Sequence, residues 1–142
     1  MTRCAVRRGV GWPGAGLLAL LIIAPGCANR HPATPEDGSP QVVRLREIFR
    51  MAQMRKKGNQ PRATRVEDFK QAELAYPQGF QALRSGACVF VWGAYADPSA
   101  DRATTVLAYE KEVPSQGGYV VMLDGTVKTM TAEEFNAAGP RR

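Results

Sequence analysis

The side chains that most often carry out chemistry in proteins are scarce in this sequence. His31 is the only histidine and lies in a proline-rich stretch, so a nucleophile elsewhere in the chain would have no imidazole base. Glu110 and Glu112 would form a carboxylate pair on a continuing strand, but a solvated run of charge explains them more simply. No cysteines and histidines have the spacing of metal ligands. We therefore expect no enzyme, no catalytic residues, no cofactor and no metal.

The first 26 residues have the organisation of a signal peptide. Arg3, Arg7 and Arg8 make the beginning basic, and a segment of apolar and small residues follows from Val10 to Ala24. That segment is too short to span a bilayer. We expect residues 1–26 to be removed. The net charge of the chain then falls from +6 to about +3, because the three arginines leave with this segment.

The end of the apolar segment, Ala24-Pro25-Gly26-Cys27, resembles the lipobox of bacterial lipoproteins, although Pro25 departs from its usual pattern. In such proteins a small residue precedes a cysteine that is diacylated and becomes the N-terminus. The resemblance implies lipid attachment at Cys27, with the lipid bilayer as partner and a location in the cell envelope, on the periplasmic side or the cell surface. The alternative is plain secretion, in which a free Cys27 can pair with Cys88 in an oxidising compartment.

The remaining chain divides into a tether and one domain. Residues 27–40 hold three prolines, a glycine and no apolar period, which predicts a flexible tether. Hydrophobic residues make up 44% of the chain and charged residues 23%, as in ordinary globular proteins. We expect residues 41–139 to form a single globular domain.

A basic amphipathic helix is predicted from Gln41 to a stop at Gly58, because apolar residues recur there with helical spacing. Its polar positions are mostly cationic: Arg44, Arg46, Arg50, Arg55, Lys56 and Lys57. They form a candidate anion-binding face for lipid head groups or nucleic acid, and basic residues continue to Arg65. The alternative is the solvated side of a helix that packs on a sheet. Nucleic acid is not expected as a partner, since the leader directs the chain out of the cytoplasm.

Strands are predicted after this helix. The continuous apolar run Ala87–Trp92 indicates a buried central strand, in which Cys88 is a small core residue. Thr104–Tyr109 is the next strand, and a polar connection, Glu110–Gly117, follows it. Asp124-Gly125 then predicts a hairpin with a two-residue type I′ turn. This turn places Leu123 opposite Thr126, Met122 opposite Val127 and Val121 opposite Lys128, with Val121, Leu123 and Lys128 on the wetter face.

Shorter helices are expected on either side of the strands. Thr64 and Glu67 have capping-box spacing, so a helix that carries Phe69 and Leu74 is predicted to begin there. Another turn of helix is expected over Gln78–Leu83. Near the C-terminus, a second capping box predicts a last helix, and it is formed by Thr131 and Glu134.

This order of elements resembles the C-terminal half of prepilin-like and pseudopilin-like bacterial proteins, in particular those with a His, nine-residue spacer, Asp-Gly signature. The residues that carry the resemblance are Leu45–Ala52, Val91–Gly93, Val106–Lys111 and Gly117–Lys128. Pro114 stands where the histidine of the signature would be. The resemblance implies a pilin-like body without the assembly helix.

Together these patterns predict an α+β fold, with the N-terminal amphipathic helix packed on a three- to four-stranded antiparallel sheet and a short C-terminal helix. The first functional hypothesis is a membrane-anchored, non-enzymatic envelope lipoprotein, a structural or interaction module with unknown protein partners. The second is an envelope carbohydrate-binding module or enzyme, which an aromatic-lined pocket around Trp92, Tyr95 or Tyr109 would favour. The third is a basic protein that binds anionic surfaces through Arg44–Arg65.

Overall fold

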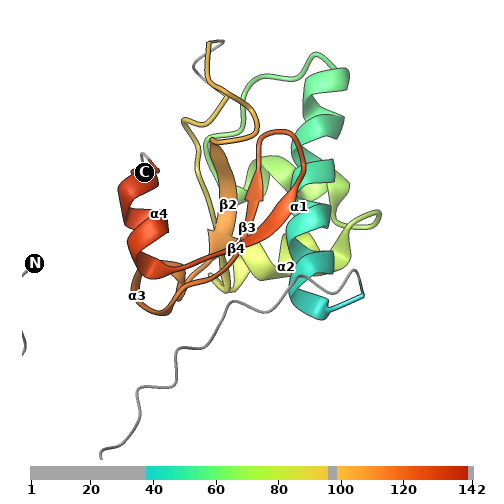
Figure 1. Ribbon diagram of the computed structural model, residues 1–142. Helices are drawn as coiled ribbons and strands as arrows, with labels where there is room; N and C mark the ends of the chain where they lie inside the picture. The colour runs from blue at the N-terminus through green and yellow to red at the C-terminus, as the bar shows by residue number, and fades with distance from the viewer. Residues whose placement is uncertain (1–37, 96–98, 141–142) are drawn as a thin grey trace, which may run out of the picture.

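The computed structural model describes residues 38–95 and 99–140. The predicted signal peptide, Cys27 and most of the predicted tether lie outside these residues. In chain order the elements are α1 (Pro40–Lys57), the 3₁₀ helix η1 (Val66–Ala72), α2 (Pro77–Arg84), β1 (Cys88–Phe90), β2 (Val106–Glu110), α3 (Val113–Gln116), β3 (Gly118–Met122), β4 (Val127–Met130) and α4 (Ala132–Ala138). The predicted α+β class is confirmed: helices pack on one four-stranded antiparallel sheet (Figure 1).

Helix α1 spans the amphipathic segment and begins one residue before Gln41. Ser39 caps it by accepting a hydrogen bond from the Val42 N–H at 3.3 Å, and Pro40 occupies the first turn, where no intrahelical donor is needed. Ser39 and Pro40 therefore belong to the helix and not to the tether. The helix ends at Gly58, as the sequence predicts. Its apolar stripe is fully covered by the rest of the domain, and the buried residues are Val42, Leu45, Ile48, Met51 and Ala52.

The sheet is a simple meander in the order β1-β2-β3-β4. β1 is therefore an edge strand, and the prediction of a central strand is wrong. Cys88 and Phe90 are nevertheless buried, because helices cover this edge strand as well. Val89, on the other face of this strand, is only partly buried, and the apolar run does not report how many neighbouring strands there are.

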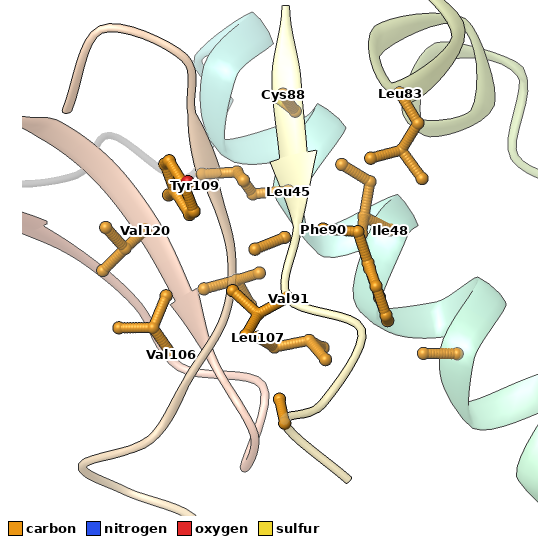
Figure 2. Packing of buried hydrophobic residues seen from close by; sticks show 14 of the residues in the cluster. Leu45, Ile48, Leu83, Cys88, Phe90, Val91, Val106, Leu107, Tyr109 and Val120 are labelled. Atoms are coloured by element: carbon orange, nitrogen blue, oxygen red, sulfur yellow. The ribbon is translucent and has the colours of Figure 1, made fainter. Parts of the chain in front are cut away.

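Both faces of the sheet are covered. Phe90, Ala108 and Val121 are paired across β1, β2 and β3, so they share the face on which α1 and η1 pack. On the other face the ring of Tyr109 lies 4.6 Å from the ring of Phe135 in α4. Figure 1 shows α1 and α4 on opposite sides of the sheet, and Figure 2 shows the packing of the core around β1.

The hairpin between β3 and β4 differs from the predicted one. Val121 pairs with Val127 and Val120 with Lys128, which is one residue away from the expected register. The Gly125 N–H donates to the Met122 carbonyl at 3.0 Å, and Gly125 has a φ of 96°. This is a three-residue loop that ends in a glycine bulge, whereas the predicted turn would also require a positive φ at Asp124.

The change of register exchanges the faces of β4. Val127 shares a face with Val121 instead of Met122, and Lys128 shares one with Val120. The prediction of a wetter face on β3 is also wrong, since Val121 and Leu123 are as buried as Val120. Helix α1 packs on the face that the sequence pattern assigns to solvent, and this packing buries Val121.

The segment after α1 contains further corrections. The helix that carries Phe69 is a 3₁₀ helix, and its capping acid is Asp68 instead of Glu67. The Asp68 carboxylate accepts from the Thr64 N–H at 2.8 Å and the Arg65 N–H at 3.2 Å, and the first of these bonds is the main cause of its lowered pKa. Leu74 is 98% exposed, so only Phe69 of the two expected apolar residues enters the core.

Helix α2 is anchored to α1 at Gly79. The Glu47 carboxylate of α1 accepts a hydrogen bond from the Gly79 N–H at 2.7 Å and so caps the first turn of α2 from a neighbouring helix. A Cβ atom at position 79 would lie 2.7 Å from the Glu47 Cβ. Glycine is therefore needed for the close approach of the two helices.

The last part of the chain follows its local signals. Thr131 caps α4, and its capping box with Glu134 is confirmed. The connection between β2 and β3 is not entirely polar, because it contains α3, whose Val113 is fully buried. None of the helices among the described residues has the length and apolar character needed to cross a membrane.

Candidate functional site

An aromatic-lined pocket lies at the C-terminal end of α1, the upper end of that helix in Figure 1. Its volume is about 290 Å³, near the lower end of the range for small-molecule sites, so its size suits a single ring. Four segments form it: the end of α1, the loop 58–65, η1 and the chain that leaves β1. The lining residues are Ala52, Arg55, Lys56, Asn59, Gln60, Pro61, Arg62, Ala63, Phe69, Phe90, Trp92 and Tyr95.

The floor of the pocket is a cluster of three rings. Phe69 and Phe90 meet edge to face, with centroids 5.3 Å apart, and both are buried. The Trp92 ring lies 4.8 Å from Phe90 and 6.2 Å from Phe69, nearly parallel to the latter. Trp92 remains partly exposed and therefore offers ring surface to the pocket. Such a surface suits a partner with a flat apolar face.

Arg55 ties the rim of the pocket together. One terminal nitrogen of its guanidinium donates to the Pro61 carbonyl at 2.7 Å, and the other donates to the Asp68 carbonyl. The guanidinium also lies 5.9 Å from the centre of the Phe69 ring, within the range of a cation–π contact. One side chain of α1 thus holds both the loop 58–65 and η1 in place around the aromatic floor.

The rim is positively charged. Arg55, Lys56 and Arg62 all line the pocket, and none of the described lining residues is acidic. Within the described residues no carboxylate forms an ion pair with any of these three cations. Lys56 and Arg62 are exposed at the rim, so their charges are free to meet a ligand.

Two polar atoms at the pocket are buried without a hydrogen-bond partner among the described residues. They are the Nε atom of Arg55 and the hydroxyl of Tyr95. Burial raises the pKa of Tyr95, and the nearby charge of Arg102 opposes this effect, so the hydroxyl is protonated at neutral pH. Unpaired buried polar atoms are uncommon in folded proteins, and their presence beside a cavity is typical of a binding site.

The structure separates the six predicted anion-binding cations. At about 100° per residue, Arg46, Arg50 and Lys57 lie on the side of α1 opposite its buried stripe. By the same spacing Arg44 and Arg55 lie on the side of the buried stripe, and Arg55 is engaged with two backbone carbonyls. Only Arg55 and Lys56 belong to the pocket. The anion-binding role of the full set stays a prediction, while its members do not share one face.

The other predicted residues lie elsewhere or outside the described residues. Cys27 falls outside them, so lipid attachment stays a prediction. Cys88 is 4% exposed, and burial raises the pKa of its thiol to about 12, with Glu110 acting in the same direction and Arg44 against it. Tyr109 does not reach the pocket, because its ring packs on Phe135. Among the described residues, no three His, Cys, Asp or Glu side chains are grouped to hold a metal ion.

Sequence reasoning marked Trp92 and Tyr95 but missed most of the pocket. Phe69 and Phe90 read as ordinary core residues, and the loop 58–65 has no motif. One signal was available in α1: Ile48, Ala52 and Arg55 follow the spacing of the apolar stripe, so a cation occupies a position where a core residue is expected.

The comparisons add no relative. The chain matches no protein-family model, no curated protein and no solved structure.

Proposed function

We propose that this protein is a non-enzymatic binding module that holds a small ring-shaped ligand in the aromatic-lined pocket. The observation that carries the proposal is the partly exposed Trp92 ring above the Phe69–Phe90 pair, in a hollow of about 290 Å³. Sugars and aromatic compounds both present a flat face to such rings. The pocket thus favours the second sequence-based hypothesis, a carbohydrate-type binding module, over a purely structural role.

Binding rather than catalysis is supported by the chemistry of the lining. Among the described residues its titratable groups are the cations Arg55, Lys56 and Arg62 and the hydroxyl of Tyr95. Tyr95 keeps its proton at neutral pH because burial raises its pKa. The described lining thus supplies hydrogen-bond donors and positive charge, but no group that would accept a proton from a substrate under these conditions.

The binding test uses a panel of single-ring probes: a neutral sugar, an acidic sugar, an aryl carboxylate and an aryl amine. Ligand-observed saturation-transfer NMR with the full chain should detect at least one of them. Ala63→Phe fills the pocket from its half-buried rim and should abolish the signal. Ala137→Phe adds the same ring at an exposed position in α4 and should preserve it. Absence of binding by every probe, or equal binding by both variants, would overturn the proposal.

The location proposed for this module is the cell envelope, with a lipid anchor at Cys27. Its support is the lipobox-like end of the leader. The first lining residue, Ala52, is 25 positions after Cys27, so a tethered domain would present the pocket away from the membrane surface. Envelope proteins or polymers that carry the ring-shaped ligand would then be the partners.

The finer fold proposal is a pilin-like body. It is supported by α1, which packs along an antiparallel meander, and by the Asp-Gly hairpin that ends this meander. A structural or interaction role within an envelope assembly is the function that such a body would favour. The apolar stripe of α1 is buried in its own domain, so this stripe is not available for filament assembly.

A further inference from the structure

We propose that the ligand of the pocket is a single ring that bears a carboxylate. The inference deepens the proposed function and rests on it, since it names the chemical class that the same pocket takes. Two sources share this chemistry: an acidic sugar and an aryl carboxylate. The experiment below distinguishes them.

The rim of the pocket is positively charged. Arg55, Lys56 and Arg62 bring three positive charges to a pocket whose described lining contains no acidic residue. Arg55 is half-buried and has lost part of its solvation, which an opposite charge nearby would offset, whereas the exposed Lys56 and Arg62 stay solvated and attract an anion through their charge. Within the described residues no carboxylate pairs with these cations, so an anionic ligand would supply the missing partner.

The cations of the rim have different roles. Both terminal nitrogens of Arg55 are engaged with the carbonyls of Pro61 and Asp68, so this residue shapes the pocket. Lys56 and Arg62 are exposed and carry no such bonds among the described residues. They are therefore the two groups that can bind a carboxylate at the mouth of the pocket.

The depth of the aromatic floor determines how the ring would lie. The aromatic floor lies deeper than the exposed cations, with Phe69 and Phe90 buried and Trp92 partly exposed. A ring that rests on Trp92 would thus point its charged substituent toward Lys56 and Arg62. Asn59, beside them on the rim, adds an exposed amide that can bind a hydroxyl group.

The test follows the indole N–H signal of Trp92 by NMR in the full chain. The sequence contains two tryptophans, so a Trp12→Phe background leaves Trp92 as the single reporter. The probes are two matched pairs: glucuronate with glucose, and benzoate with benzyl alcohol. We expect the carboxylate of at least one pair to bind about tenfold more tightly than its neutral partner. The pair with the stronger carboxylate identifies the source as sugar or aryl acid.

The variants separate a specific contact from general attraction. Lys56→Gln with Arg62→Gln should weaken carboxylate binding about tenfold and leave the neutral probe unchanged. Arg50→Gln with Lys57→Gln removes the same charge from exposed positions on the far side of α1, and should change carboxylate binding less than about twofold.

Three results would contradict the inference. If the neutral probes bind as tightly as the carboxylates, the pocket is a binding site without anion preference, and only this inference fails. If both double variants weaken binding equally, the charges act from a distance and not at the rim. If no probe of either charge shifts the Trp92 signal, the proposed binding function fails as well.

Discussion

The close contact of α1 with α2 predicts that Gly79→Ala destabilises the domain. A Cβ atom at position 79 would lie 2.7 Å from the Glu47 Cβ and 2.9 Å from the Ile48 backbone nitrogen, whereas ordinary contacts are 3.4–4 Å. Both obstacles belong to or lie beside the backbone of α1, so a side-chain rotation cannot relieve them. The helices must separate by about 0.7 Å, the difference between 2.7 and 3.4 Å.

The free-energy change follows from three contributions. Forcing a methyl group into a packed contact costs about 1–3 kcal/mol. Separation also lengthens the 2.7 Å hydrogen bond from Gly79 to the Glu47 carboxylate, and bonds to charged groups contribute about 1.5–3 kcal/mol. In the opposite direction, replacing a glycine within a helix by alanine stabilises the helix by about 0.5–1 kcal/mol. We expect a net loss of about 2–4 kcal/mol in the free energy of unfolding.

Urea unfolding followed by circular dichroism measures this loss. Gly93→Ala is the matched control, because its added methyl would meet nothing within 4 Å and its φ is not in the left-handed region. The control should change the free energy of unfolding by less than about 1 kcal/mol. Equal stability of the Gly79→Ala and Gly93→Ala variants would refute the account of the α1–α2 contact.

The remaining predictions concern the anchor, the buried thiol and the hairpin. Cys27→Ser should move the protein from the membrane fraction to the soluble fraction without unfolding the domain, and intact mass should show acyl groups only on the wild type; lipid-free wild-type protein would refute the anchor. The folded Cys88 thiol keeps its proton up to about pH 12 while the unfolded thiol loses it near 9, so alkali should destabilise the fold, by about 1.4 kcal/mol per pH unit above 9. In Cys88→Ala the free energy of unfolding should therefore fall less between pH 8 and pH 10 than in the wild type. An equal fall in both proteins would contradict this cause. Gly125→Ala should destabilise the hairpin by about 1–3 kcal/mol, because φ at Gly125 is 96° and the added methyl would lie 2.7 Å from the Phe49 ring. If urea unfolding shows no loss of stability in this variant, that result would count against the glycine bulge.

Local signals in the sequence were sufficient for the helices whose ends are set by their own residues. The stop of α1 at Gly58 and the Thr131–Glu134 capping box depend on contacts within a few positions of the chain.

Features that depend on distant residues could not be predicted. The register of β3 and β4 follows from a glycine bulge, and the close packing of Phe49 on Gly125 is set by α1, more than 70 positions earlier. The cap of α2 comes from Glu47 of another helix. Each of these features depends on residues that only the tertiary structure brings together, so neighbouring residues in the sequence do not determine it.

The candidate site shows the same division. Trp92 and Tyr95 were recognisable as aromatic residues outside a regular strand. Their neighbours in the pocket could not be deduced, because Arg55 fixes the loop 58–65 through carbonyl groups, and any residue can supply those. A backbone carbonyl that will accept such a bond cannot be recognised from the sequence, because every residue has one.

A map of backbone amide shifts in the full chain, recorded with the tightest-binding ring probe, would show where this ligand binds. We expect the largest shifts on two segments that are distant in sequence, Asn59–Ala63 and Trp92–Tyr95, which meet at the pocket. Shifts centred on Arg44 and Gln81, which line a second hollow beside α2, would contradict this expectation, as would the absence of shifts.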